Sequence, residues 1–233
     1  MSVLKVFGHA TSQPTRAVLW LCSIKKLPVE LIKVDPMKGE NKSKEFRSKF
    51  PIGLIPAIED GDFRLGESNA ILSYLCRKHD WNDFYPKNNE KRAKIDEYLH
   101  FHHHHSRVFS GVLFRPTLFT ILLKQKFPDP PREKQISSVR KAAKILENFL
   151  ESSPFLANSQ QPTIADLAAY CELDQIFALN KAGFDLFDFN PYPNILKWSE
   201  RMEKFDQHDQ IRKTLFKTVE LVAKQSQQIK ANL

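Results

Sequence analysis

The chain has 233 residues, of which 42% are hydrophobic and only 7 are glycine, a composition typical of a globular protein with one or two compact domains. Lys and Arg outnumber Asp and Glu by 35 to 27, which gives a formal net charge of +8. The basic residues are scattered among acidic ones instead of forming a stripe, so we expect neither nucleic acid nor a membrane surface as a partner.

The cysteines and the N-terminus indicate a protein of a reducing compartment. The three cysteines lie far apart and follow no metal-ligand spacing, so they resemble buried apolar residues rather than a disulfide framework. The N-terminal residues show no charged-then-apolar leader, and the richest apolar stretch, residues 112–123, is interrupted by Arg115 and Pro116. We therefore expect a cytoplasmic protein.

In the first eighty residues, short apolar runs typical of strands alternate with amphipathic segments typical of helices, and an Asp-Gly turn predicts a hairpin. The predicted elements are a strand at 4–7, a helix at 14–26, a strand at 29–34, a short helix within the polar stretch 35–49, strands at 55–59 and 63–65, and a helix at 67–79. Two parallel strands joined by a helix and followed by a hairpin and a covering helix predict a thioredoxin-like α/β domain over residues 1–80.

The rest of the chain is expected to be helical. After a polar and aromatic connector at residues 81–87, amphipathic segments are separated by prolines at 128–131, 154, 162 and 191–193. The predicted fold class is α/β plus all-α, with an all-helical domain over residues 88–233.

The first candidate site lies between the first strand and the first helix. Pro14 marks the start of the helix, and Ser12 precedes it. The Ser12 hydroxyl could accept a backbone N–H as a helix cap, or it could donate outward to an anion at the positive end of the helix. The residue types alone leave both alternatives open.

Two further segments could hold an extended, acidic ligand. Ile55-Pro56 opens a strand and is a candidate cis peptide, which would turn the backbone of Ile55 toward an edge where a peptide can pair. Glu67 and Ser68 open a helix whose free N–H groups can receive a carboxylate, although simple capping explains them equally well.

Taken together in this order, these segments resemble the glutathione transferases, and the theta class in particular. The segments that carry the resemblance are Ser12-Gln13-Pro14-Thr15-Arg16-Ala17, Val34-Asp35, Lys38-Gly39, Ile55-Pro56-Ala57, Asp60-Gly61-Asp62-Phe63, Glu67-Ser68, Asp96-Glu97-Tyr98-Leu99 and the capping box Thr163-Ile164-Ala165-Asp166. The resemblance is dense to about Leu99 and thin afterwards.

The resemblance implies an enzyme that conjugates the thiolate of glutathione to small hydrophobic electrophiles, or that reduces hydroperoxides with it. Ser12 would hold the sulfur as a thiolate by hydrogen bonding, and Thr11 is the alternative hydroxyl. Glutathione would be a co-substrate, no other cofactor is expected, and the family forms homodimers. The alternative is a non-catalytic module of the same fold that binds ligands or serves assembly.

The resemblance also assigns the rest of the glutathione site. Glu67 and Ser68 would bind the γ-glutamyl end, and the Ile55 backbone would pair with the cysteinyl amide. Asn41 and Leu54 occupy positions where theta-type enzymes usually have a histidine and a lysine that contact the glycyl end, so this contact is in doubt unless Lys38, Lys42 or Lys44 replaces it.

The histidine run His102 to His105, with His100, lies in the first long helix of the second domain. Histidines four residues apart can share a helix face and bind a metal, but no carboxylate or cysteine is placed with them, so no metal site is predicted. In the family this helix lines the electrophile site. The candidates there are His104, Arg107 and Phe114.

Overall fold

The computed structural model describes residues 3–123 and 133–231, and it places four strands in one sheet. The strands are β1 (Leu4–Gly8), β2 (Val29–Lys33), β3 (Ala57–Asp60) and β4 (Phe63–Gly66), in the order β2-β1-β3-β4. β1 is parallel to β2 and antiparallel to β3, and β3 and β4 form the predicted hairpin. The predicted strands are therefore confirmed, with ends that differ by one or two residues.

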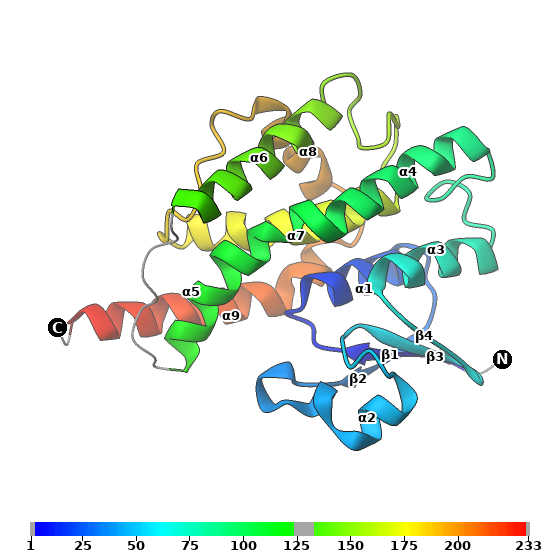
Figure 1. Cartoon of the computed structure of the whole chain (residues 1–233), viewed down its shortest axis with the longest axis horizontal. Helices are drawn as coiled ribbons and strands as arrows, with labels where there is room; N and C mark the ends of the chain where they lie inside the picture. The colour runs from blue at the N-terminus through cyan, green and yellow to red at the C-terminus, as the bar shows by residue number, and fades with distance from the viewer. Residues whose placement is uncertain (1–2, 124–132, 232–233) are drawn as a thin grey trace.

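Helices cover both faces of this sheet (Figure 1). On one face lie α1 (Gln13–Ile24) and α3 (Ser68–Lys78), and on the other lies the short α2 (Lys44–Lys49), preceded by two single-turn 3-10 helices at Pro36–Lys38 and Glu40–Lys42. A small separate core fills the α2 side and consists of Phe7, Val34, Phe46, Phe50 and Ala57. The sheet and its helices are the predicted thioredoxin-like arrangement.

The junction between β1 and α1 depends on close packing at Gly8. A Cβ atom at Gly8 would lie 2.6 Å from Cγ2 of Thr15, which is fully buried in the first turn of α1. Such a distance is too short for any side chain, so glycine lets the helix approach the end of the strand. This approach fixes where the loop of residues 9–12 begins and ends.

In the remainder of the described chain the regular secondary structure is helical, apart from an isolated bridge between Phe155 and Ser159. α7 is buried along nearly its whole length and packs against α1, so one helix joins the two halves of the molecule (Figure 1). The helices are α4 (Asn89–Phe101), π-helical turns at His102–Ser106 and Phe109–Phe114, α5 (Arg115–Leu122), α6 (Glu133–Phe149), α7 (Ile164–Lys181), α8 (Pro193–Glu203) and α9 (His208–Ala231).

Several predictions remain outside these observations. The proline break at residues 128–131 lies outside the described residues, and the domain boundaries 1–80 and 88–233 stay predictions. Within the described ranges, no helix combines the length and the hydrophobicity that a membrane span requires. The three cysteines are free and buried, as predicted, and burial raises the thiol pKa of each to about 12; they are Cys22, Cys76 and Cys171.

Candidate functional site

The hydroxyl of Ser12 is not used as a helix cap. Ser12 has the extended backbone of an N-cap residue, with φ −69° and ψ 119°, and it is half-buried, but its side chain accepts no capping hydrogen bond. Ser43 and Thr163, in contrast, accept backbone N–H groups at the starts of α2 and α7. The hydroxyl at the start of α1 is therefore available to a ligand at the positive end of that helix.

The neighbouring hydroxyl of Thr11 is already engaged. Its Oγ1 lies 2.7 Å from Nδ1 of His9, and the Thr11 amide donates to the same nitrogen at 3.3 Å. Because Nδ1 accepts from the amide, it carries no proton, and the Thr11 hydroxyl must donate to it. Among the residues that the structure describes, the Ser12 hydroxyl has no such partner, in contrast to that of Thr11.

A pocket lies beside the start of α1, where the two halves of the chain meet. It brings together Leu54, Ile55, Glu67, Ser68 and Arg107 of the predicted site. Five further residues line it, namely Pro14, Pro56, Asn69, His102 and His103. All but Asn69 belong to segments that the sequence had already singled out. Ser12 is not among the lining residues; it precedes Pro14 by two positions.

The backbone at the base of this pocket has two unusual conformations. The Ile55–Pro56 peptide is cis, as the sequence suggested. Glu67 adopts φ 64° and ψ 110°, a region that residues with a Cβ rarely occupy, and its side chain does not cap α3. The free N–H groups at the start of α3 are therefore available to a carboxylate.

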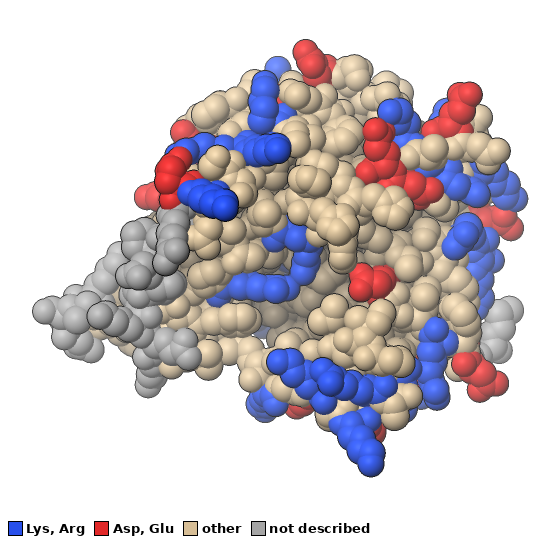
Figure 2. Space-filling model, viewed as in Figure 1, with Lys and Arg blue, Asp and Glu red and all other residues tan. Residues whose placement is uncertain are grey.

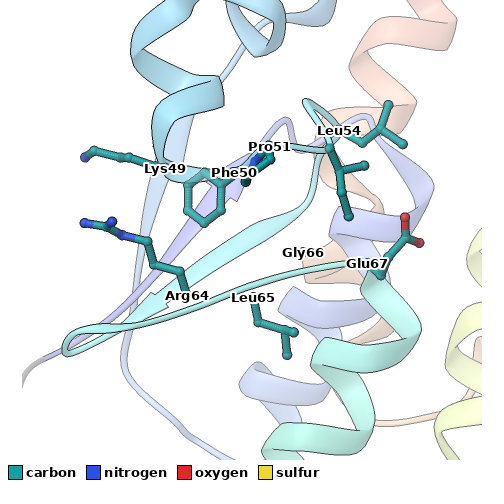
Figure 3. Close-up of a pocket in the computed structure, with 9 residues that line it drawn as sticks. Lys49, Phe50, Pro51, Leu54, Arg64, Leu65, Gly66 and Glu67 are labelled. Atoms are coloured by element: carbon teal, nitrogen blue, oxygen red, sulfur yellow. The ribbon is translucent and has the colours of Figure 1, made fainter.

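A second pocket adjoins the first and shares Leu54 and Glu67 with it. Figure 3 shows these two side chains at one end and Lys49 and Arg64 together at the other. Lys49 and Arg64 lie 3.5 and 3.2 Å from Oε1 of Glu59, so both cations already have a partner. Leu54 is 57% exposed and offers only an apolar surface here.

The side chain of Asn41 makes a hydrogen bond within the protein. It is buried, and its Nδ2 donates to the carbonyl of Gly53 at 2.7 Å, while its Oδ1 has no partner. This bond holds the short helix before α2 against the turn that leads to Leu54. Asn41 is not among the described residues that line either pocket.

The histidines of the run have different environments. His102 is buried and lies 3.8 Å from Glu172, whereas His103, His104 and His105 are exposed. His103 lines the pocket beside Arg107, but His104 does not. Among the described residues, no three side chains are arranged to hold a metal ion. Phe114, the third electrophile-site candidate, is buried in the core, 5% exposed.

Glu172 of α7 connects both sides of the site and was not predicted. Its side chain is fully buried and accepts from Gln13, the residue after Ser12, and from the amide of Ser110 at 2.8 Å. Arg107 reaches the same carboxylate, with its Nη1 3.5 Å from Oε2. The available signal was a glutamate among the apolar residues of α7, because buried carboxylates need donors.

Arg107 contributes a positive charge to the wall of the pocket. Its side chain is 29% exposed, and burial, followed by the charge of Arg107, lowers the pKa of nearby Arg115. Figure 2 shows Lys and Arg side chains gathered in a hollow at the centre of the face in view. Among the described residues that line this pocket, Arg107 is the only Lys or Arg and Glu67 is the only carboxylate.

We expect His102 to make stability depend on pH. Burial lowers its pKa from 6.5 to about 4, so the unfolded chain binds a proton there that the folded chain does not bind. Stability should therefore be complete above pH 6.5 and should fall by about 3 kcal/mol as the pH decreases to 4. Urea unfolding at several pH values measures this slope.

The matched variants for that measurement are His102→Leu and His103→Leu. His102→Leu should remove the contribution of His102 to the dependence of the unfolding free energy on pH. His103→Leu, at an exposed position, should leave that dependence as in the wild type. Equal slopes for wild type and His102→Leu would contradict the assignment.

Comparison with known proteins gives the family. Residues 2–77 match "Glutathione S-transferase, N-terminal domain", and residues 129–201 match "Glutathione S-transferase, C-terminal domain". Human glutathione S-transferase theta-2B is 38% identical over 87% of this chain and 81% of its own length, and the rat theta-2 enzyme is 35% identical over the same shares. A crystal structure of human glutathione transferase theta-2 with glutathione superposes with a TM-score of 0.83, at 35% identity, over 95% of this chain and 90% of the other.

A second human theta-class structure, in complex with the glutathione conjugate of 1-menaphthyl sulfate, has a TM-score of 0.83 at 33% identity and covers 97% of this chain and 92% of that one. The resemblance noted from the sequence, which is densest in the first hundred residues, thus extends along both matched regions. The chain belongs to the glutathione S-transferase family, and the relatives named above are theta-class enzymes.

Proposed function

We propose that this protein conjugates the thiolate of glutathione to small hydrophobic electrophiles, with Ser12 as the residue that stabilises the thiolate. The observation that carries the proposal is the uncommitted hydroxyl of Ser12 at the positive end of α1, beside the pocket. A hydroperoxide is a second electrophile class for the same thiolate. Ser12 acts as a hydrogen-bond donor and forms no covalent intermediate.

The expected strength of this interaction is sufficient for catalysis. A thiol has an ordinary pKa near 8.5, and its thiolate is the nucleophile. One hydrogen bond to a charged group contributes about 1.5–3 kcal/mol, which lowers a pKa by roughly one to two units, and a helix N-terminus adds about 0.3–1 kcal/mol. The bound sulfur would then be largely ionised near neutral pH.

The other parts of glutathione are expected to bind along the pocket, from the γ-glutamyl end at Ser68 to the glycyl end at Leu54. The α-carboxylate of the γ-glutamyl end meets the free N–H groups of α3 at Ser68, and its ammonium group meets the carboxylate of Glu67. The backbone of Ile55 pairs with the cysteinyl amide. The glycyl carboxylate then lies toward exposed Leu54. The cations of the adjoining pocket, Lys49 and Arg64, both pair with Glu59, and neither occupies the position of the expected lysine.

The electrophile enters from the helical half of the chain. Arg107 lies in the pocket wall and can balance the negative charge that a leaving group gains as the carbon–sulfur bond forms. We keep His104, which is exposed, and Phe114, which is buried, as proposed residues of the electrophile site. We also retain as predictions a glutathione-binding domain at residues 1–80, an electrophile-binding domain at 88–233, a homodimer and a cytoplasmic location.

The test compares Ser12→Ala with Thr11→Val. We expect Ser12→Ala to lower the conjugation rate at neutral pH by about 10- to 100-fold, with glutathione affinity nearly unchanged, because the loss affects the thiolate and not the rest of the tripeptide. Thr11→Val should stay within a few-fold of wild type. Initial rates with a benzylic halide and with cumene hydroperoxide measure both.

Two results would count against the assignment. Conjugation by Ser12→Ala at the wild-type rate would remove Ser12 from the mechanism, and a large loss in Thr11→Val alone would transfer the role to Thr11. Glutathione-agarose retention of the wild type without conjugation of any electrophile would favour the non-catalytic alternative.

A further inference from the structure

We propose that His9 is a positioning residue for the thiolate-stabilising loop, and that its Nδ1 holds Thr11 so that Ser12 alone presents a hydroxyl to the sulfur. The inference rests on the proposed role of Ser12. It concerns residues 9–12, which connect the end of β1 to the start of α1.

Two hydrogen bonds that both involve His9 close this loop. The Ser12 amide donates to the His9 carbonyl at 2.9 Å, and the Thr11 amide donates to His9 Nδ1 at 3.3 Å. The next backbone bond, from the Arg16 amide to the Ser12 carbonyl at 2.9 Å, is already the first turn of the helix. The side chain of His9 therefore sets the direction in which the chain enters α1 at Ser12.

The third contact decides which hydroxyl is free. Thr11 Oγ1 lies 2.7 Å from His9 Nδ1 and must donate its proton there, since the same nitrogen already accepts from an N–H. A hydroxyl has one proton, so Thr11 cannot donate to a thiolate at the same time. Without His9, Thr11 and Ser12 would be two adjacent hydroxyls in competition, and the loop would lose its side-chain anchor.

The surroundings keep His9 in the form that this role requires. Burial lowers the pKa of His9 below its usual 6.5, and among the charged groups that face it, Asp35 and Glu40 oppose this shift while Lys33 adds to it. The imidazole is therefore neutral at ordinary pH. A neutral ring with its proton on Nε2 leaves Nδ1 as the acceptor that the Thr11 amide needs.

The position of the acceptor nitrogen allows a sharp test with two amides. The side-chain oxygen of asparagine can take the place of Nδ1, whereas that of glutamine extends toward the place of Nε2. We would titrate the ultraviolet absorption of the thiolate of bound glutathione in wild type, His9→Asn, His9→Gln and Ser12→Ala. Melting temperatures are recorded in parallel to separate a change in the loop from a change in stability.

We expect His9→Asn to keep the wild-type pKa of the bound thiol and His9→Gln to raise it by about one unit, the amount that a misdirected hydrogen bond accounts for. Ser12→Ala should raise it at least as much.

If Ser12→Ala raises the pKa but His9→Gln does not, the role of His9 is overturned and the proposed function stands. If Ser12→Ala leaves the pKa unchanged, both are overturned. Equal loss in His9→Asn and His9→Gln would also overturn the assignment to Nδ1.

Discussion

Asp174→Ala is expected to destabilise the protein by about 3–5 kcal/mol, because it leaves a buried arginine without its counter-ion. Nη1 of Arg16, in α1, lies 3.2 Å from Oδ2 of Asp174, in α7, and both side chains are at most 2% exposed. Arg212 of α9 reaches the other carboxylate oxygen at 2.8 Å. Without Asp174, Arg16 keeps only the carbonyl of Cys171, at 2.8 Å.

The free energy of unfolding in urea measures this loss, and Asp83→Ala is the matched control. Asp83 pairs with Lys25, the residue that follows α1, but the side chain of Asp83 is 49% exposed, so its removal should change stability by less than about 1 kcal/mol. The double variant Arg16→Met with Asp174→Leu should recover part of the loss, since it removes the buried Arg16–Asp174 pair and leaves only Arg212, whose side chain is 14% exposed, without the carboxylate. Equal, small losses in both single variants would show that the buried pair contributes little.

Asp166→Ala is expected to lower the free energy of unfolding by about 3–5 kcal/mol. The mechanism differs from that of Asp174→Ala, because four hydrogen-bond donors lose the one carboxylate that accepts from all of them. Oδ1 of Asp166 accepts from the Leu156 amide and from Nε1 of Trp198, both at 2.9 Å. Oδ2 accepts from the amide and hydroxyl of Thr163 at 2.8 and 3.0 Å. The carboxylate is fully buried, so these donors would have no water to replace it.

Thr163→Ala separates the capping of α7 from this larger role. It removes only the hydroxyl, which accepts from the Ala165 amide at 3.2 Å, and should cost about 1 kcal/mol. Near-ultraviolet circular dichroism should report the released Trp198 indole in Asp166→Ala and not in Thr163→Ala. Similar losses in the two variants would mean that the capping box alone explains Asp166.

The sequence was informative where the interactions are local. The Asp60-Gly61 turn and its flanking strands predicted a hairpin, which the structure confirms in the pairing of Asp60 with Phe63. Thr163 and Asp166 predicted a capping box, which is also confirmed. In each case, the donor and the acceptor lie within a few positions of one another in the chain, so their separation in the sequence also determines their distance in the folded protein.

Ser12 shows where a local pattern becomes ambiguous. A serine before a helix-starting proline predicts a cap as well as a free donor, and the sequence could not choose between them or between Ser12 and Thr11. The structure leaves the Ser12 side chain without a capping bond and ties Thr11 to His9. Although His9 is only three residues away, its contact depends on the loop conformation, which Gly8 and Thr15 fix by packing.

The amino-acid sequence by itself determined the type and order of the elements, the hairpin and the helix starts, because periodicity and short-range hydrogen bonds act between near neighbours. Only the tertiary structure decided which charges meet. Gln13 and Glu172 are 159 positions apart, and Arg16 and Asp174 are 158 apart, yet both pairs join α1 to α7. Such buried polar pairs form only when packing removes their side chains from water, and no local pattern in the chain encodes that removal.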